Sequence, residues 1–324
     1  MGNFQLADKL TFYCSYPLYA YASGMLELAE SDTDLTQEQL FNLINLNPSK
    51  ISSFNTEALD NIGFYINHNI KPDFFMTLGH NFANQQNITL QGDDGVLDAT
   101  QIVNSNIDTD CEYNGWSLVN LANVDSKSMI MQFNNQAENM VGSFLWGRKF
   151  VAPQNVDVSQ THSVSYGYKS KKSVSGKTIS TLNYSKTGKW LLDAWELDAN
   201  AADTRNEPTN SRNGIRTWSV NFSFLQDSKM MAQNNMLNSN NWTQDSQGEY
   251  SLAADNSSAF DTNNSTDFYT SVIKQSMGGH LPLVINISDS TNSDQWAIVR
   301  ISDYQVTQAN PKFINYKLTL EEQV

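Results

Sequence analysis

The sequence predicts a mainly β fold, and two observations support that prediction. First, the chain contains 38 Asn among its 324 residues, and Asn favours turns over helix interiors, which is typical of many strands joined by turns. Second, the segment Leu281–Val324 divides into three strands, the first two of them apolar and joined by a polar turn. The strands are Leu281–Ile287, Gln295–Ile301 and Phe313–Leu320. The last strand largely alternates between polar and apolar residues, the period of a half-buried antiparallel strand. We therefore expect this segment to close the sheet of a β-domain, with Trp296–Arg300 as the central strand.

Length and charge limit the organisation and the partners of the chain. A length of 324 residues suggests two domains, or three smaller pieces. The formal net charge is −14, and residues 1–150 carry 6 Lys and Arg against 17 Asp and Glu. Binding of free nucleic acid requires a basic face, so we expect no nucleic-acid partner. No apolar stretch approaches the roughly 20 residues that span a bilayer, and Met1–Lys9 does not resemble a secretion signal. We expect a protein without a membrane span that is made in a cytoplasm.

Residues 1–57 are predicted to form an aromatic and helical arm. The stretch Phe12–Leu28 is rich in aromatic residues and is interrupted by Pro17 and Gly24. After it, Thr36 is suited to cap a helix, and the apolar residues that follow predict a short amphipathic helix ending near Asn47. Such an arm either docks on a neighbouring subunit or covers a sheet of its own chain, and the sequence leaves both alternatives open.

Residues 58–155 read as strands separated by turns. The predicted strands are Asn61–Asn67, Phe74–Gly79, Gln86–Gln91, Gly115–Leu121 and Ser128–Phe133. A long apolar run, Asn139–Phe150, contains the pattern G-x-x-x-x-G-R-x-F and is followed by Pro153 and Asn155. This ending resembles that of a small jelly-roll module in tailed-bacteriophage tail proteins, which is similar to discoidin and galactose-binding-like domains. The resemblance implies a jelly-roll β-sandwich over residues 58–155.

Residues 156–324 are predicted to form a second β-domain. Alternating segments at His162–Tyr168 and Thr178–Tyr184 flank a cluster of lysines at a hairpin tip. The strand Ile215–Leu225 has one apolar face and one solvent-facing polar face. Asp267–Lys274 is predicted to be a short helix. The polar segment 234–265 is interpreted as an insertion that projects from the surface. The lysine tip is either a solvated loop or an ionic contact for an acidic partner.

The succession of elements in this second domain resembles the tube-ring domain of distal tail and related tail-tip proteins of tailed phages. The matching segments are Trp218–Phe222, Leu281–Leu283, Trp296–Arg300 and Leu318–Glu322. The resemblance implies a β-barrel or β-sandwich ring domain over residues 156–324, with one or two short helices, after the jelly roll. The insertion, and a jelly roll placed before the ring domain, depart from the family pattern and leave the position in the tail open.

No catalytic constellation is recognisable in the sequence. It contains no G-x-S-x-G elbow and no G-x-x-x-x-G-K-[ST] loop. Neither the two cysteines, Cys14 and Cys111, nor the histidines have metal-ligand spacing; the histidines are His68, His80, His162 and His280. The turn Asp289–Asp294 lacks the calcium-loop pattern. We predict a non-enzymatic protein without a cofactor, and a glycan-degrading enzyme is the last alternative.

The tail-protein resemblance implies a structural virion protein located in the phage tail. Copies would form a homo-oligomeric ring, expected to be a hexamer, at the distal tail or baseplate. The ring would join the tail tube to tip, hub or fibre proteins. The residues predicted to make ring contacts are Trp218, Phe222, Trp296, Arg300, Tyr304 and Phe313.

The alternative function is a carbohydrate- or receptor-binding module for host attachment. Aromatic side chains exposed on the jelly roll would stack on the sugar rings of a host surface glycan. The predicted contacts are Tyr113, Trp116 and Trp146.

Overall fold

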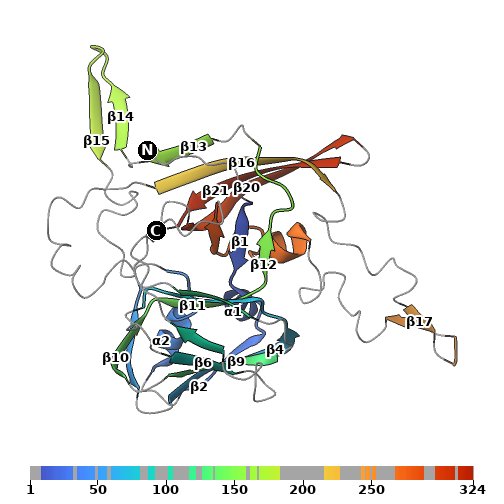
Figure 1. The fold of residues 1–324 in the computed structure, drawn as a ribbon. Helices are drawn as coiled ribbons and strands as arrows, with labels where there is room; N and C mark the ends of the chain where they lie inside the picture. The colour runs from blue at the N-terminus through green and yellow to red at the C-terminus, as the bar shows by residue number, and fades with distance from the viewer. Residues whose placement is uncertain are drawn as a thin grey trace.

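The computed structural model describes most of the chain in two stacked β-sheet parts (Figure 1). The described residues are 9–31, 35–47, 50–56, 60–80, 87–91, 101–104, 117–121, 126–133, 136–157, 161–165, 168–182, 215–226, 242–244, 246–248, 250–252, 267–287, 296–310 and 313–323. Strands predominate among them and the helices are short, which confirms the predicted mainly β fold class.

A seven-stranded antiparallel sheet forms the upper part in Figure 1. Its strands, in spatial order, are β12 (Lys149–Val151), β1 (Thr11–Cys14), β19 (Leu283–Asn286), β20 (Trp296–Asn310), β21 (Phe313–Glu322), β16 (Ile215–Gln226) and β13 (Thr161–Ser165). The central strand is β20, as the sequence predicted for Trp296–Arg300. The strand runs on to Asn310, however, well beyond the predicted end at Ile301.

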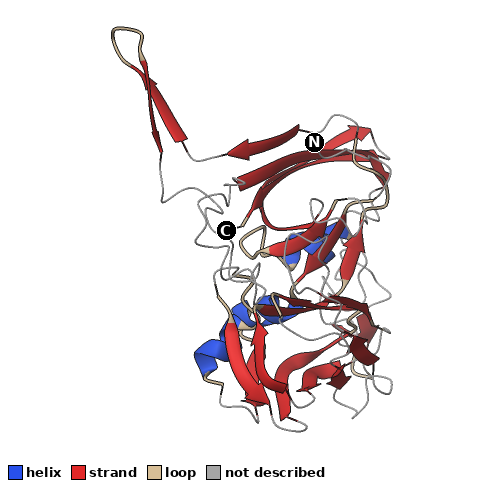
Figure 2. Cartoon of the chain, turned by 60° about the vertical axis from the view of Figure 1, so that its left-hand side comes forward, coloured by secondary structure: helices blue, strands red, loops and turns tan. Residues whose placement is uncertain are grey.

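The long strands of this sheet arch over a short π-helix, η5 (Tyr269–Lys274) (Figure 2). The apolar residues of β21 face it: Tyr316 and Leu318 are buried, whereas Lys317 between them is exposed. Phe268, at the N-terminal end of η5, packs its ring edge-on against Tyr316 at a centroid distance of 5.3 Å. The alternation predicted for Phe313–Leu320 and the helix predicted over Asp267–Lys274 are thus confirmed, and together they build the upper core.

The lower part is a β-sandwich. One sheet has five strands, in the order β2 (Leu26–Ser31), β4 (Asp60–Ile70), β9 (Ser126–Phe133), β6 (Asn87–Gln91) and β7 (Gln101–Asn104). The other has three strands, in the order β11 (Ser143–Gly147), β5 (Phe74–Leu78) and β8 (Ser117–Asn120). A separate pair joins β10 (Gln136–Val141) to β3 (Ser52–Thr56). Phe64 of β4 contacts Trp146 of β11 at 5.4 Å across the core, so the two sheets face each other as in a jelly-roll sandwich.

Two short helices close one side of the lower core. The first, α1 (Tyr16–Ala22), is capped by Ser15, whose hydroxyl accepts a hydrogen bond from the backbone N–H of Leu18. The second, α2 (Gln37–Asn42), begins with a capping box in which Thr36 and Gln39 satisfy each other's backbone N–H groups. The cap predicted at Thr36 is confirmed. Both helices pack buried side chains into the sandwich, which fixes the orientation of their exposed residues.

The two parts share a third apolar cluster between them. Strand β5 is buried along its whole length, with Phe75 in the sandwich core and Phe74 and Met76 turned toward the upper sheet. There, Tyr13 of β1 packs edge-on against Phe74 at 5.0 Å and stacks on Trp296 of β20 at 5.5 Å. A strand covered on both faces reads as a continuous apolar run, which is the pattern F-F-M-T-L. The three-stranded sheet therefore packs with one face in the sandwich core and with the other against the upper sheet.

Among the described residues, the chain crosses from the upper to the lower part between β1 and α1 and returns between β11 and β12, and these two passages lie side by side. Residue Gly147 is so close to the first passage that an added Cβ would lie 2.9 Å from the carbonyl oxygen of Cys14. The passages divide the chain differently from the predicted boundaries. Of the predicted arm over residues 1–57, β1 belongs to the upper sheet, and α1, β2, α2 and β3 belong to the lower part. The residues near position 150 belong to the upper sheet as well.

Two small hairpins stand apart from these sheets. The first joins β14 (Tyr168–Lys172) to β15 (Thr178–Leu182) and projects away from the body in both views (Figures 1 and 2). The second joins β17 (Trp242–Gln244) to β18 (Tyr250–Leu252) and lies within the predicted 234–265 insertion. In Figure 1 this second hairpin also lies away from both parts.

Candidate functional site

The surface formed by Tyr21 and Phe41 is the candidate binding site of the lower part, and we call it the aromatic platform. Tyr21 lies near the end of α1 and is 43% exposed, and its ring rests on Phe41 of α2 at a centroid distance of 4.7 Å. Gln37 and Glu38 are exposed one turn before Phe41, and on a helix this spacing puts their side chains beside it. The platform therefore combines an open aromatic ring with amide and carboxylate groups at its rim.

The aromatic platform is not apparent from the sequence. The aromatic stretch Phe12–Leu28 and the helix after Thr36 are recognisable, but not that two helices bring Tyr21 and Phe41 together. The signal present in the sequence was the exposed face of a short helix that carried an aromatic residue. That signal becomes specific only when the packing of α1 against α2 is known.

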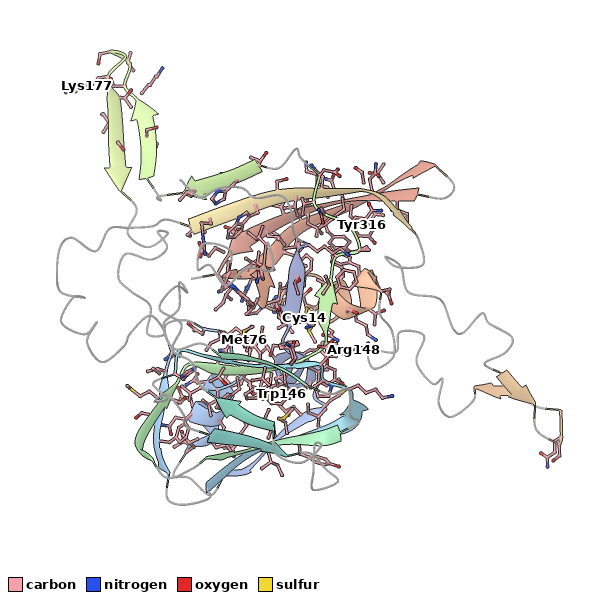
Figure 3. The ribbon with its side chains drawn as sticks, in the orientation of Figure 1. Cys14, Met76, Trp146, Arg148, Lys177 and Tyr316 are labelled. Carbon is pink, nitrogen blue, oxygen red and sulfur yellow. The ribbon has the colours of Figure 1, made fainter. Side chains whose placement is uncertain are left out.

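The predicted glycan contacts are not brought together by the structure. Trp146 is fully buried between the sheets of the sandwich (Figure 3), so the prediction that it contacts a glycan is wrong. The alternation on β11 turns it toward Phe64 and away from solvent. Tyr113 and Trp116 lie outside the described residues.

The predicted ring contacts divide into buried and exposed residues. Trp218, Phe222 and Trp296 are at most 5% exposed, because they complete the cores of their own chain, and in this structure they present no surface to a second copy. Arg300 and Tyr304 are exposed on β20, where they are available to a partner. The side chain of Phe313 lies outside the described residues.

A buried ion pair ties together four strands of the upper sheet. Arg216 of β16 makes a salt bridge of 2.7 Å with Glu322 of β21 and donates a second bond to the carbonyl oxygen of Trp296. Its guanidinium lies 5.1 Å from the ring centre of Trp218, on which His162 of the edge strand β13 also stacks. Burial lowers the pKa of His162, and the nearby Arg216 lowers it further, while Glu322 partly opposes the shift. This arrangement attaches β13 to the sheet and offers no reactive group to a substrate.

A half-buried carboxyl lies where the chain enters the upper part, and its contacts are structural. Asp73 accepts a hydrogen bond of 2.8 Å from the backbone N–H of Lys149, and its own N–H donates to the carbonyl oxygen of Gly147. Burial raises the pKa of Asp73, and the bond from Lys149 and the charges of Lys149 and Arg148 oppose that rise. A carboxyl with a raised pKa is a typical candidate for acid catalysis. Here its role is to hold the turn between β11 and β12.

The described residues contain no metal centre and no membrane helix. No group of three or more His, Cys, Asp or Glu side chains that could hold a metal ion occurs in the part of the chain that the structure describes. Within the same residues, none of the helices has the length and apolar character needed to cross a membrane. The turn at Asp289–Asp294 and the side chain of His68 lie outside the described part of the structure.

Comparison with known proteins gives structural neighbours but no sequence family. No family model and no curated protein matches the sequence. Among solved structures, a family 32 carbohydrate-binding module from a family 31 glycoside hydrolase of Clostridium perfringens has a TM-score of 0.30 at 9% identity, covering 39% of this chain and 93% of the module. The family 32 module of C. perfringens NanJ, solved with galactose, has a TM-score of 0.29 at 12% identity, covering 41% and 98%.

A third neighbour is a fucose-binding module of Streptococcus pneumoniae, with a TM-score of 0.28 at 10% identity, covering 37% of this chain and 93% of the module. These neighbours are carbohydrate-binding modules by their descriptions. The likeness extends over about two fifths of this chain and is weak. What the chain itself binds has to be inferred from its own residues.

Proposed function

We propose that the lower part of this protein is a non-catalytic carbohydrate-binding module. The observation that carries the proposal is the aromatic platform, in which the exposed ring of Tyr21 is supported by Phe41. The apolar C–H face of a sugar ring packs on such an aromatic surface, and the hydroxyl groups around the sugar need hydrogen-bond partners at the rim. Gln37 and Glu38 supply an amide and a carboxylate there.

The platform is held in place before any ligand arrives. Both helices are capped, and their buried residues, such as Ala20 and Leu40, pack in the sandwich core. A preorganised site loses little conformational entropy on binding, which favours affinity. An open platform with one aromatic ring is expected to bind single sugars weakly, and several copies on one particle would increase the avidity.

The test is binding of the full chain to a glycan array, followed by affinity measurement on the best ligand. Tyr21→Ala should weaken binding about tenfold, the equivalent of roughly 1.4 kcal/mol, and Tyr21→Phe should restore it because the ring remains. Tyr65→Ala is the matched control, since Tyr65 is also exposed at 36% but lies on β4. An array without any bound glycan, or equal losses for Tyr21→Ala and Tyr65→Ala, would reject the proposal.

We propose as a second function that the upper part assembles copies of the chain into a ring in a phage tail. The observation that favours it is that the upper sheet has open edges within the described residues. The terminal strands β13 and β12 pair only with β16 and β1, and beyond Arg300 strand β20 pairs only with β21. Exposed edges of this kind recruit further strands. Two different edges on one sheet allow head-to-tail pairing, which closes a ring when the rotation is right.

The proposed location of this ring follows from the resemblance to distal tail proteins. The ring would lie in the virion tail, between the tail tube and the tip or fibre proteins, and the lower part would face outward toward a host glycan. Of the residues predicted for ring contacts, Arg300 and Tyr304 remain candidates because both are exposed along the open edge of β20.

Particle mass and electron microscopy test the ring. Val164→Lys on β13 and Val306→Lys on β20 should each prevent assembly, because a charged lysine on an edge strand disfavours pairing with a strand of another copy. The two valines are 38% and 43% exposed, so the monomer should tolerate both changes. Tyr65→Lys, at a side chain that is 36% exposed on β4, is the control, because β4 has a paired strand on each side. A wild-type protein that stays monomeric at high concentration would rule out the ring.

A further inference from the structure

The β14–β15 hairpin is a well-formed element that projects from the molecule without covering any core. Its register pairs Lys172 with Thr178, and its turn is closed by a hydrogen bond of 2.9 Å from the N–H of Ser173 to the carbonyl oxygen of Lys177. Gly176 takes the left-handed conformation, φ +81°, that a three-residue hairpin loop requires at that position. The hairpin is therefore shaped by its own turn rather than by packing on the body.

Apolar and basic side chains at the end of this hairpin face solvent together. Val174 at the apex is fully exposed, and Ile179 is 56% exposed. Lys171, Lys172 and Lys177 are exposed around them, and the label at Lys177 marks their position at the end of the projection (Figure 3). A two-stranded hairpin exposed on both faces is only marginally stable in water, and neighbouring positive charges add repulsion. An element built in this way gains stability when a partner covers it.

The charge of the hairpin is opposite to that of the remainder of the chain. Residues 168–182 contain 4 Lys and no Asp or Glu, whereas the whole chain has a formal net charge of −14. Residues 1–150 are the most acidic region, with 17 Asp and Glu against 6 Lys and Arg. A basic projection on an acidic protein is electrostatically complementary to another copy of the same protein.

We propose that the tip of this hairpin, residues 171–179, is an ionic docking element that binds the acidic first 150 residues of a second copy of the chain. Val174 enters the contact as an apolar anchor, and the three lysines around it steer and orient the approach. The contact deepens the proposed ring, because it supplies a link between copies that does not use the sheet edges. It is independent of the carbohydrate proposal.

Salt dependence of self-association tests the ionic part of the contact. Full-length protein is examined by sedimentation velocity at about 50 mM and about 500 mM NaCl, which changes the screening length from roughly 14 to roughly 4 Å. The triple variant K171Q/K172Q/K177Q should weaken association at low salt at least about tenfold and should lose the salt dependence. The control K9Q/K50Q/K317Q removes three exposed lysines elsewhere and changes the net charge equally; because Lys9 and Lys50 belong to the acidic region itself, it should not weaken association. Equal effects of the two triple variants would overturn the proposal.

Cross-linking from the apex tests the location of the contact. A Val174→Cys variant, with Cys111→Ser, carries a benzophenone maleimide; Cys14 is buried, and burial raises its pKa to about 12, so its thiol stays unlabelled. Mixing isotopically light and heavy chains should give cross-links between copies, ending within residues 1–150. Cross-links confined to one copy, or ending elsewhere, would refute the docking site.

The failure of the hairpin contact can be told from the failure of the ring. If Val164→Lys and Val306→Lys abolish rings while K171Q/K172Q/K177Q leaves them intact at all salt concentrations, the ring stands and the hairpin proposal falls. Adding anionic vesicles or single-stranded DNA to the same assay identifies the other anionic partners. Binding of either to the hairpin, without self-association, replaces the second copy as the partner and overturns the proposal.

Discussion

The two halves of strand β20 belong to one continuous strand but have opposite surroundings. Its first residues, Trp296–Val299, lie between β19 and β21 and are at most 5% exposed, with side chains in both the upper core and the cluster shared with the lower part. Beyond Arg300 the strand pairs, among the described residues, with β21 alone, and Tyr304 and Val306 are exposed. One continuous strand therefore fixes the fold at one end and offers an edge to a partner at the other. The stability of the molecule and its capacity to assemble should be separable by mutation along β20.

The largest effect is expected from the ion pair that anchors the buried half. Glu322→Gln removes the buried carboxylate that forms the salt bridge with the largely buried Arg216, and this should lower the free energy of unfolding by about 3–5 kcal/mol. The control is Glu321→Gln at the exposed neighbour, with an expected loss below about 1 kcal/mol. Urea denaturation measures both. Equal losses of stability for Glu322→Gln and Glu321→Gln would show that the salt bridge with Arg216 does not stabilise the fold more than an exposed carboxylate does.

A matched pair of truncations compares the two halves directly. Ile298→Ala removes a fully buried side chain from the cluster between the parts and should cost about 2–5 kcal/mol. Val306→Ala, at a position that is 43% exposed, should cost at most about 0.5 kcal/mol. Thermal or urea unfolding of the monomer checks both values. A similar cost at Val306 would mean that the exposed half of β20 is packed in solution, for example against another copy.

The smallest effect concerns the edge strand β13 and appears as a pH dependence. The pKa of His162 is held below its ordinary value of 6.5, so as the pH falls the unfolded chain takes up the proton before the folded one. Stability should therefore decrease as the pH falls through about 6.5, and His162→Gln should flatten that part of the profile. His280→Gln, at an exposed histidine, controls for the loss of an imidazole. An NMR titration that places the pKa of His162 above 6.5 would contradict the prediction.

Local pattern predicted the elements better than it predicted their partners. The alternation in Phe313–Leu320, the continuous apolar run Phe74–Gly79 and the cap at Thr36 all depend on neighbours a few residues away, and each was confirmed. The polar second half of β20 was missed because its strand is defined by backbone pairing rather than by buried side chains.

Burial of the tryptophans shows the same limit for the candidate sites. Alternation marks Trp218, and continuous apolar runs mark Trp146 and Trp296, as residues that are covered. Whether they are covered by the same chain, another copy or a sugar depends on contacts with distant residues. The pair Tyr21 and Phe41 was missed for the same reason, since the residues are separated by twenty positions and meet only through packing of α1 and α2.

The placement of β1 has a consequence for how the molecule is made. Thr11–Cys14 are synthesised about 270 residues before Leu283–Asn286, which is one of their two neighbouring strands. At about 5–20 residues per second, this first strand waits for tens of seconds with one edge unpaired. Pairing over such a sequence separation also makes folding slow. The upper sheet is therefore completed only after β19 has been synthesised, so ring assembly through the complete sheet cannot begin before that point.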